Sequence, residues 1–172
     1  MASLMENLIE VLGQESEEYE GLLALSQKKM RIIAGANLED LQKITDDEQE
    51  VVSRLNRLEK RRIEVAADIA NVLNKDVETM KLTNLIEMLS ARPAEQAALA
   101  AVHDRLNSVV RELKRTNEQN SELLEEALEL VNFEMNMLQA YKAAPETANY
   151  TRSAYNSGAQ MGVDSGGFDA KQ

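Results

Sequence analysis

The feature of this sequence that most restricts its fold is the recurrence of apolar residues at every third or fourth position through three long segments. Because an α-helix turns once in about 3.6 residues, residues at this spacing share one face of a helix. The pattern covers residues 4–33, 38–72 and 99–138. The few polar residues in it are Glu15 and Ser26 in the first segment, Glu48 and Arg62 in the second, and Asn117 and Asn120 in the third. The sequence therefore predicts three long helices, each with an apolar face that another helix must cover.

Residues that start or stop helices mark the boundaries of these segments. Gly35 interrupts the first pattern, and Asn37 can cap the next helix through its side-chain oxygen. Thr83 is expected to cap a short helix, Pro93 suits the first turn of the last helix, and Pro145 ends it. Together these signals predict helices at about 3–34, 38–74, 84–90 and 93–142. The pattern leaves residues 75–90 open between helix, loop and hinge.

Long helices joined by short links pack as antiparallel neighbours. The predicted fold is therefore all-α, an antiparallel bundle of long coiled-coil-like helices over residues 1–143. From residue 144 to 172 no helical period persists, and this segment holds four of the seven glycines, so it is expected to be a flexible tail. The pattern does not decide whether the bundle closes within one chain or through a homodimer.

Composition excludes several classes of function. The chain has no cysteine and one histidine, so disulfides, thiolate zinc sites and catalysis by a cysteine are excluded. A net charge of −11 repels phosphate groups, so no nucleic-acid partner is expected. No apolar run is long enough to insert into a membrane, and the N-terminal stretch has no basic region typical of a secretory signal. A cytoplasmic location is expected.

The residues offer nothing for an enzyme. A carboxylate di-iron site needs a Glu three residues before a His, but Ala100 stands at that place before His103. Adjacent acidic pairs such as Asp46 and Asp47 are typical of a solvated helix face. We therefore expect no catalytic residue, no metal and no cofactor.

The end of the third segment is apolar on more than one face of the helix, which requires a cover. The cover is either the bundle's own helices or an amphipathic helix of another chain, to which flexible methionines adapt well. The apolar residues are Leu123, Leu124, Leu128, Leu130, Val131, Phe133, Met135, Met137 and Leu138. The following tail carries Tyr150, Tyr155 and Phe168, so the tail is either a docking segment or a disordered end that happens to carry aromatic residues.

Several stretches of the sequence resemble the FlgN family of flagellar export chaperones. They include residues 19–29 (YEGLLALSQKK), the turn at 35–41 (GANLEDL), residues 44–49 (ITDDEQ), 58–62 (LEKRR) and 82–86 (LTNLI). In the last helix the resemblance continues from Leu106 through Asn117 and Asn120 to Leu138. In the tail, Tyr155 to Gly158 is similar to a Tyr-x-x-Gly element of the family.

The resemblance implies a cytoplasmic chaperone without enzymatic activity. It implies binding to the C-terminal helical ends of the hook–filament junction proteins FlgK and FlgL, protection from premature assembly, and delivery to the type III export gate. The family's binding region lies toward its C-terminal end. Transferred to this sequence, that region contains Leu124, Leu128, Val131, Met135, Leu138, Tyr155 and Gly158. A self-associating structural coiled coil without a client is the alternative that the helical pattern leaves open.

Overall fold

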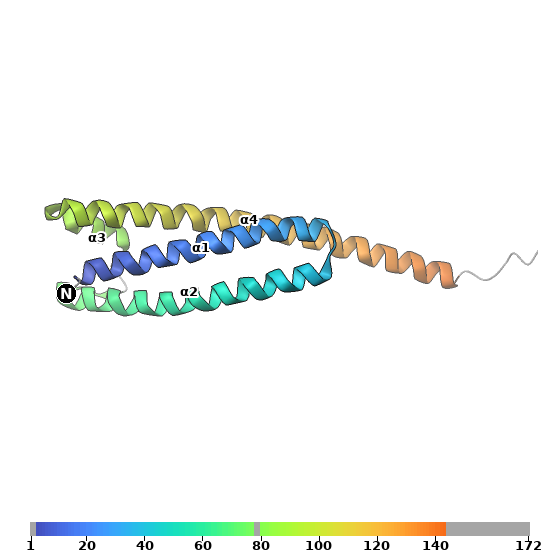
Figure 1. Ribbon diagram of the computed structural model, residues 1–172, viewed down its shortest axis with the longest axis horizontal. Coiled ribbons are helices and arrows are strands. Elements are labelled where there is room, and N and C mark those ends of the chain that lie inside the picture. Colours follow the sequence, from blue (N-terminus) through green and yellow to red (C-terminus); the bar gives the residue numbers. More distant parts are fainter. Residues whose placement is uncertain (1–2, 78–79, 144–172) are drawn as a thin grey trace, which may run out of the picture. The chain divides into compact units, whose positions relative to one another are not determined.

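The computed structural model describes residues 3–77 and 80–143, and every regular element in these ranges is a helix. The elements are α1 (Leu4–Ala34), α2 (Leu38–Leu73), α3 (Leu82–Met88), the short 3-10 helix η2 (Leu89–Ala91) and α4 (Pro93–Ala143) (Figure 1). The all-α fold predicted from the apolar spacing is confirmed. Within the described residues there is also no helix long and apolar enough to cross a membrane.

The chain divides into two compact units, one of residues Met1–Leu130 and one of residues Val131–Gln172. Helix α4 contributes residues to both units. Residues 131–143 are the described part of the second unit, and all of them are helical and exposed. The expected flexible tail, 144–172, lies outside the described residues, so the division into a bundle and a tail stays a prediction.

Hydrogen bonds from side chains set the starts of α1 and α2. Ser3 and Glu6 form a reciprocal capping box, in which the Glu6 backbone N–H donates to Ser3 Oγ and the Ser3 N–H donates to the Glu6 carboxylate. The Asn37 side chain accepts from the Asp40 N–H and so caps α2, as the sequence predicted. Between the two helices the left-handed residue is Ala36, with φ of 51°, whereas Gly35 has φ of −82°.

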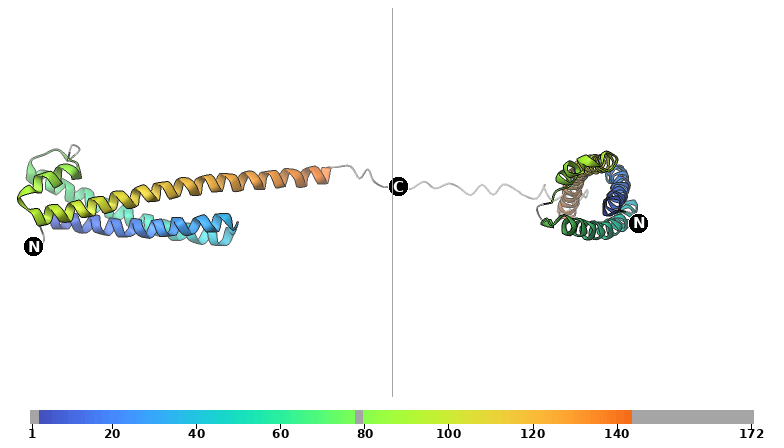
Figure 2. Two further views of the ribbon diagram at one scale, coloured as in Figure 1. Left: turned by 90° about the horizontal axis from the view of Figure 1, so that it is seen from above. Right: turned by 90° about the vertical axis from the view of Figure 1, so that its left-hand side faces the viewer.

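Three ion pairs fix the antiparallel packing of α1 on α2. Glu15 pairs with Arg62, Glu18 with Arg54, and Lys29 with Glu48, so residue numbers fall along α2 as they rise along α1. Helix α4 runs in the same direction as α1 and is joined to it by the pair of Glu20 with Arg105 and by hydrogen bonds of Ser26 with Asn117 and Asn120. Figures 1 and 2 show α1, α2 and the first part of α4 side by side, with α3 at the end where α4 begins.

The short helix α3 closes one end of the bundle. Leu85 and Leu89 join a buried cluster with residues of all three long helices. The cluster consists of Leu8, Leu12, Val65, Ile69, Leu85, Leu89 and Leu99. Thr83 was expected to cap this helix, and that expectation was wrong. The helix begins earlier, at Leu82, after Lys81, whose side chain makes no capping hydrogen bond; the early start lets Leu82 pack against the cluster.

The spacing of three or four residues places Val52 and Val110 in the apolar faces, and at each of these places the structure buries the neighbouring valine instead. The structure buries Val51 and exposes Val52 by 43 %, and it buries Val109 and exposes Val110 by 40 %. Adjacent residues on a helix point about 100° apart, so the spacing alone could not decide which valine of each pair faces the core. The buried positions on α4 continue from Val109 through Leu113, Thr116 and Asn120.

We expect the Ala36→Gly variant to be more stable than the natural protein by about 0.5–1 kcal/mol, because a Cβ is strained at a positive φ. Urea denaturation followed by circular dichroism would measure the free energy of unfolding. The matched control is Gly35→Ala. Its added Cβ would lie 3.4 Å from the Arg31 carbonyl oxygen, an ordinary contact, at an ordinary φ. We expect the control to change stability by less than about 0.5 kcal/mol; a loss of stability in Ala36→Gly would contradict the prediction.

Candidate functional site

A layer of polar residues joins α1 to α4 where the apolar faces of the long helices meet. We call this line of contact between the helices the seam. Asn120 is 4 % exposed, and its Nδ2 donates to the Ser26 backbone carbonyl at 2.8 Å and to Ser26 Oγ at 3.1 Å. Ser26 Oγ in turn donates to Asn117 Oδ1 at 2.6 Å. The sequence placed all three residues in the seams, where polar residues fix register at some expense of stability. The structure shows that they face one another.

A groove of about 330 Å³ lies beside this layer and is lined by α1, α2 and α4. Its apolar walls are Leu22, Val52 and Leu124. Its polar lining consists of Asn117, Asn120, Ser121 and the ion pair of Lys29 with Glu48, in which Nζ and Oε2 are 2.7 Å apart. Sequence reasoning missed this groove. The available signal was the polar residue Glu48 in the seam of α2, but its partner Lys29 lies outside the apolar pattern of α1.

A second polar contact in the seam joins Glu15 to Arg62. Glu15 is 4 % exposed, and Arg62 Nε donates to its Oε1 at 3.0 Å. Burial raises the pKa of the Glu15 carboxyl above its ordinary value, and the attraction of Arg62 offsets only part of this effect. The pair lies between the two helices and lines neither the groove beside Asn120 nor the cavity near α3, so we assign it to packing register rather than to chemistry.

The last turns of α4 carry an exposed apolar surface. We use this name for Val131, Phe133, Met135, Met137, Leu138 and Tyr141, whose exposed fractions range from 52 % to 86 %. Each large apolar side chain gains roughly 1.5–3 kcal/mol when it is fully buried. Large contiguous apolar patches on a folded protein mark interaction sites. This surface is therefore a candidate binding site for another polypeptide.

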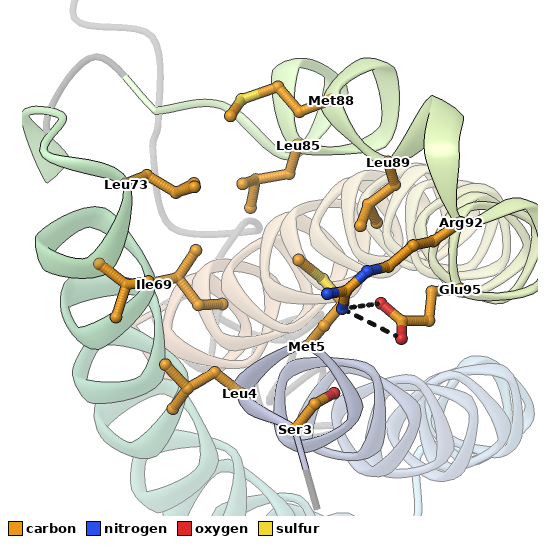
Figure 3. Close-up of a pocket in the computed structure, with 11 residues that line it drawn as sticks. Ser3, Leu4, Met5, Ile69, Leu73, Leu85, Met88, Leu89, Arg92 and Glu95 are labelled. Atoms are coloured by element: carbon orange, nitrogen blue, oxygen red, sulfur yellow. Dashed lines mark hydrogen bonds and ion pairs between the residues drawn. The ribbon is translucent and has the colours of Figure 1, made fainter.

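A further cavity of about 340 Å³ lies at the end of the bundle near α3 (Figure 3). Leu4 and Met5 of α1, Ile69 of α2, and Leu85 and Met88 of α3 supply most of its apolar wall. Arg92 donates to the Glu95 carboxylate at 3.3 Å, and this ion pair lies at one side of the cavity (Figure 3). The lining holds apolar groups, one ion pair and Ser3, whose hydroxyl caps α1, an arrangement for packing rather than for acid–base catalysis.

Within residues 3–77 and 80–143, no three His, Cys, Asp or Glu side chains come together, so these residues form no candidate metal site. The lone histidine, His103, is partly buried and lies 3.2 Å from Asp104 Oδ1 on the same helix. Asn107 is its other neighbour. This surface contact along α4 resembles no metal centre.

The residues that the family resemblance placed in the binding region fall into three groups. Leu124 is partly buried and lines the groove between the three helices. Leu128 is 61 % exposed near the end of the first unit, and Val131, Met135 and Leu138 belong to the exposed apolar surface. Tyr155 and Gly158 lie outside the described residues. Sequence reasoning did not include Phe133, Met137 or Tyr141 in the predicted site, although their apolar character was visible.

The described residues form an all-helical bundle whose last helix exposes apolar side chains, and such surfaces often mark binding sites for other polypeptides. The chain belongs to the FlgN family, because residues 1–158 match the family described as FlgN protein. Members of this family are flagellar export chaperones, and the general role of this chain is the same. The family is one of chaperones rather than enzymes. No curated protein and no solved structure matches the chain.

The raised pKa of the buried Glu15 carboxyl leads to a prediction about how the stability of the protein depends on pH. Because its pKa is raised above 4.5, its contribution to stability is fully present below about pH 4.5 and is lost as the pH rises through the raised value. Glutamine mimics the protonated carboxyl, so we expect Glu15→Gln to be more stable than the natural protein at pH 7. The two should converge below pH 4.5. Thermal unfolding from pH 4 to pH 8 would measure the difference.

Glu20→Gln is the control with the opposite sign. The hydrogen bond from Arg105 lowers the pKa of the exposed Glu20 carboxyl, so its contribution is present above pH 4.5 and is lost as the pH falls through the lowered value. We expect Glu20→Gln to be slightly less stable than the natural protein at pH 7. A Glu15→Gln variant that is less stable at pH 7 would show that the Arg62 attraction exceeds the effect of burial.

Proposed function

We propose that this protein is the cytoplasmic chaperone of the hook–filament junction proteins of the FlgK and FlgL type. It binds their C-terminal amphipathic helices, prevents premature assembly and delivers them to the flagellar type III export gate. The observation that carries this proposal is the exposed apolar surface on α4. An amphipathic client helix has the complementary apolar face, and laying one apolar helix face on another is a common mode of peptide recognition.

The proposed contact residues on α4 are Leu124, Leu128, Val131, Met135 and Leu138, which follow one another at intervals of three or four residues on a single helix. Such intervals place them along one face. Methionine adapts its shape to different partners, which suits a chaperone that serves more than one client. In the tail, Tyr155 and Gly158 are proposed to contact the client, and Tyr155 to contact the export gate.

The net charge of −11 supports the same function. A protein that exposes apolar side chains tends to aggregate, and a net charge far from zero opposes this through mutual repulsion. The charge also disfavours binding to nucleic acid.

Replacing Val131, Met135 and Leu138 together by serine should weaken client binding at least tenfold, because each side chain loses apolar contact area. The residues are exposed, so folding should be preserved. Calorimetric titration with purified FlgK-type and FlgL-type junction proteins would measure the dissociation constants, and circular dichroism would check folding.

A matched control replaces Leu38 and Val72 by serine. They are 79 % and 74 % exposed on α2, so the control removes apolar groups that are even more exposed from another helix. We expect its affinity for the client to equal that of the natural protein. Equal affinity in both variants would refute the proposed contact surface.

Truncating the chain after Ala144 tests the tail. We expect weaker client binding with almost unchanged helical content, because the sequence of residues 144–172 carries no helical period. Unchanged affinity would remove Tyr155 and Gly158 from the proposed client site.

The second candidate function is a self-associating structural coiled coil. The same apolar surface favours it, since a second copy of the chain could cover that surface. Light scattering after size exclusion separates the two functions. A stable complex with a junction protein supports the chaperone, and homo-oligomers that ignore the junction protein support the structural protein.

A further inference from the structure

Two stretches of the chain carry only negative charge, and one of them surrounds the proposed contact residues of α4. Residues 1–27 and residues 116–141 each hold six Glu and no Asp, Lys or Arg. The first stretch covers most of α1, and the second covers the C-terminal half of α4. Each contributes −6 to a chain whose net charge is −11, so the other residues together are close to neutral.

The bundle supplies cations to the acidic stretch of α1. Glu15, Glu18 and Glu20 pair with arginines of α2 or α4, at distances from 2.7 Å to 3.0 Å. Glu6 accepts a hydrogen bond from the Ser3 N–H in the capping box. Much of the negative charge on α1 is therefore balanced inside the folded chain.

The acidic stretch of α4 receives no such cations. Its six carboxylates are exposed, and none forms an ion pair or hydrogen bond with another described residue. They belong to Glu118, Glu122, Glu125, Glu126, Glu129 and Glu134. Opposite charges on one helix pair at a separation of three or four residues. The nearest basic residues on α4 are Arg115 before Glu125 and Lys142 after Glu134, each more than two helical turns away.

These glutamates border the proposed contact residues of α4. Glu125 and Glu129 each come one position after such a residue, and Glu134 comes one position before another. Adjacent residues of a helix point about 100° apart. Glu125 and Glu129 therefore lie on one side of the apolar contact face, and Glu134 lies on the other side. A helix bound to this face meets carboxylates along both edges of the contact.

The charge disfavours the two occupants that this chain could itself provide. A second copy that covered these residues with its own α4 surface would bring two all-negative stretches together, and like charges at short range repel. Residues 144–172 hold two basic and three acidic residues, so their charge does not complement the surface either. The occupant with the complementary charge is a helix that carries Lys or Arg.

We propose that the contact residues of α4 select a client helix whose apolar face is bordered by Lys or Arg. Apolar side chains such as Met135 and Leu138 supply the contact area, and Glu125, Glu129 and Glu134 pair with the basic side chains at its edges. The long stems of Lys and Arg extend the apolar cover while their charged ends reach the carboxylates. The proposal rests on the proposed chaperone function and adds a charge requirement for the client.

The test uses the full-length chain with Glu125→Gln, Glu129→Gln and Glu134→Gln combined, and full-length FlgK-type or FlgL-type junction proteins as the probe. Glutamine keeps the size and the helix propensity of glutamate, so circular dichroism should be unchanged. In about 0.01 M salt the affinity should fall about tenfold, mainly through slower association. In about 1 M salt, where the Debye length shortens from about 30 Å to about 3 Å, the difference should nearly vanish.

A matched control makes the same change in net charge on another helix. It combines Asp47→Asn, Glu64→Gln and Asp68→Asn on α2, three exposed residues without an ion pair among the described residues. We expect its affinity for the client to stay within about twofold of that of the natural protein, because its charges lie on a different helix from the contact residues.

Substitutions in the client complete the test. Each Lys and Arg of the client's C-terminal helical region is replaced by Gln in turn. At least one replacement should weaken binding to the natural chain several-fold and leave binding to the glutamate variant unchanged, as expected for a direct pair. Equal affinity of the natural chain and the glutamate variant in low salt, or an equal loss in the α2 control, overturns this inference and leaves the proposed function standing. If the natural chain binds neither junction protein, both are overturned.

Discussion

Burial of the apolar face of α1 against the other helices is the interaction on which the rest of the structure depends. Leu8 and Leu12 are completely buried in the cluster that α2, α3 and α4 also enter. Every ion pair or polar contact between long helices described above has one partner on α1, namely Glu15, Glu18, Glu20, Ser26 or Lys29. Without α1, the described faces of α2 and α4 would lose these partners.

Polar residues within the seams act differently from those on the surface. Glu15 and Asn120 are each 4 % exposed, so an unpaired group at either place would be costly. A helix shifted by one turn would separate Glu15 from Arg62 and Asn120 from Ser26. The seam therefore selects one register. Exposed pairs such as Lys43 with Glu39 lie within one helix and contribute little to this selection.

The exposed apolar surface on α4 and the groove beside Asn120 illustrate two kinds of incomplete burial. The first exposes large side chains, among them Phe133 and Leu138, that would gain free energy from any apolar cover. The second lies within the bundle and combines apolar walls with polar side chains whose hydrogen bonds join α1 to α4. A surface of the first kind gives affinity with little selectivity.

The sequence by itself determined the helices and most of their ends. Apolar spacing is a local property, and caps such as Asn37 act within one turn, so both are visible in the chain. The same spacing showed that the end of α4 is apolar around much of its circumference. It also placed Ser26 and Asn120 in the seams.

The tertiary structure alone decided which residues meet. It selected Val51 over Val52 and Val109 over Val110, because neighbouring residues differ by a rotation of the helix that only packing against a partner sets. It paired Ser26 with Asn120 across 94 positions of the chain, and it left Asn120 Oδ1 without a donor among the described residues. Hydrogen bonds and grooves between helices depend on their relative register and rotation, and periodicity along one helix carries no information about either.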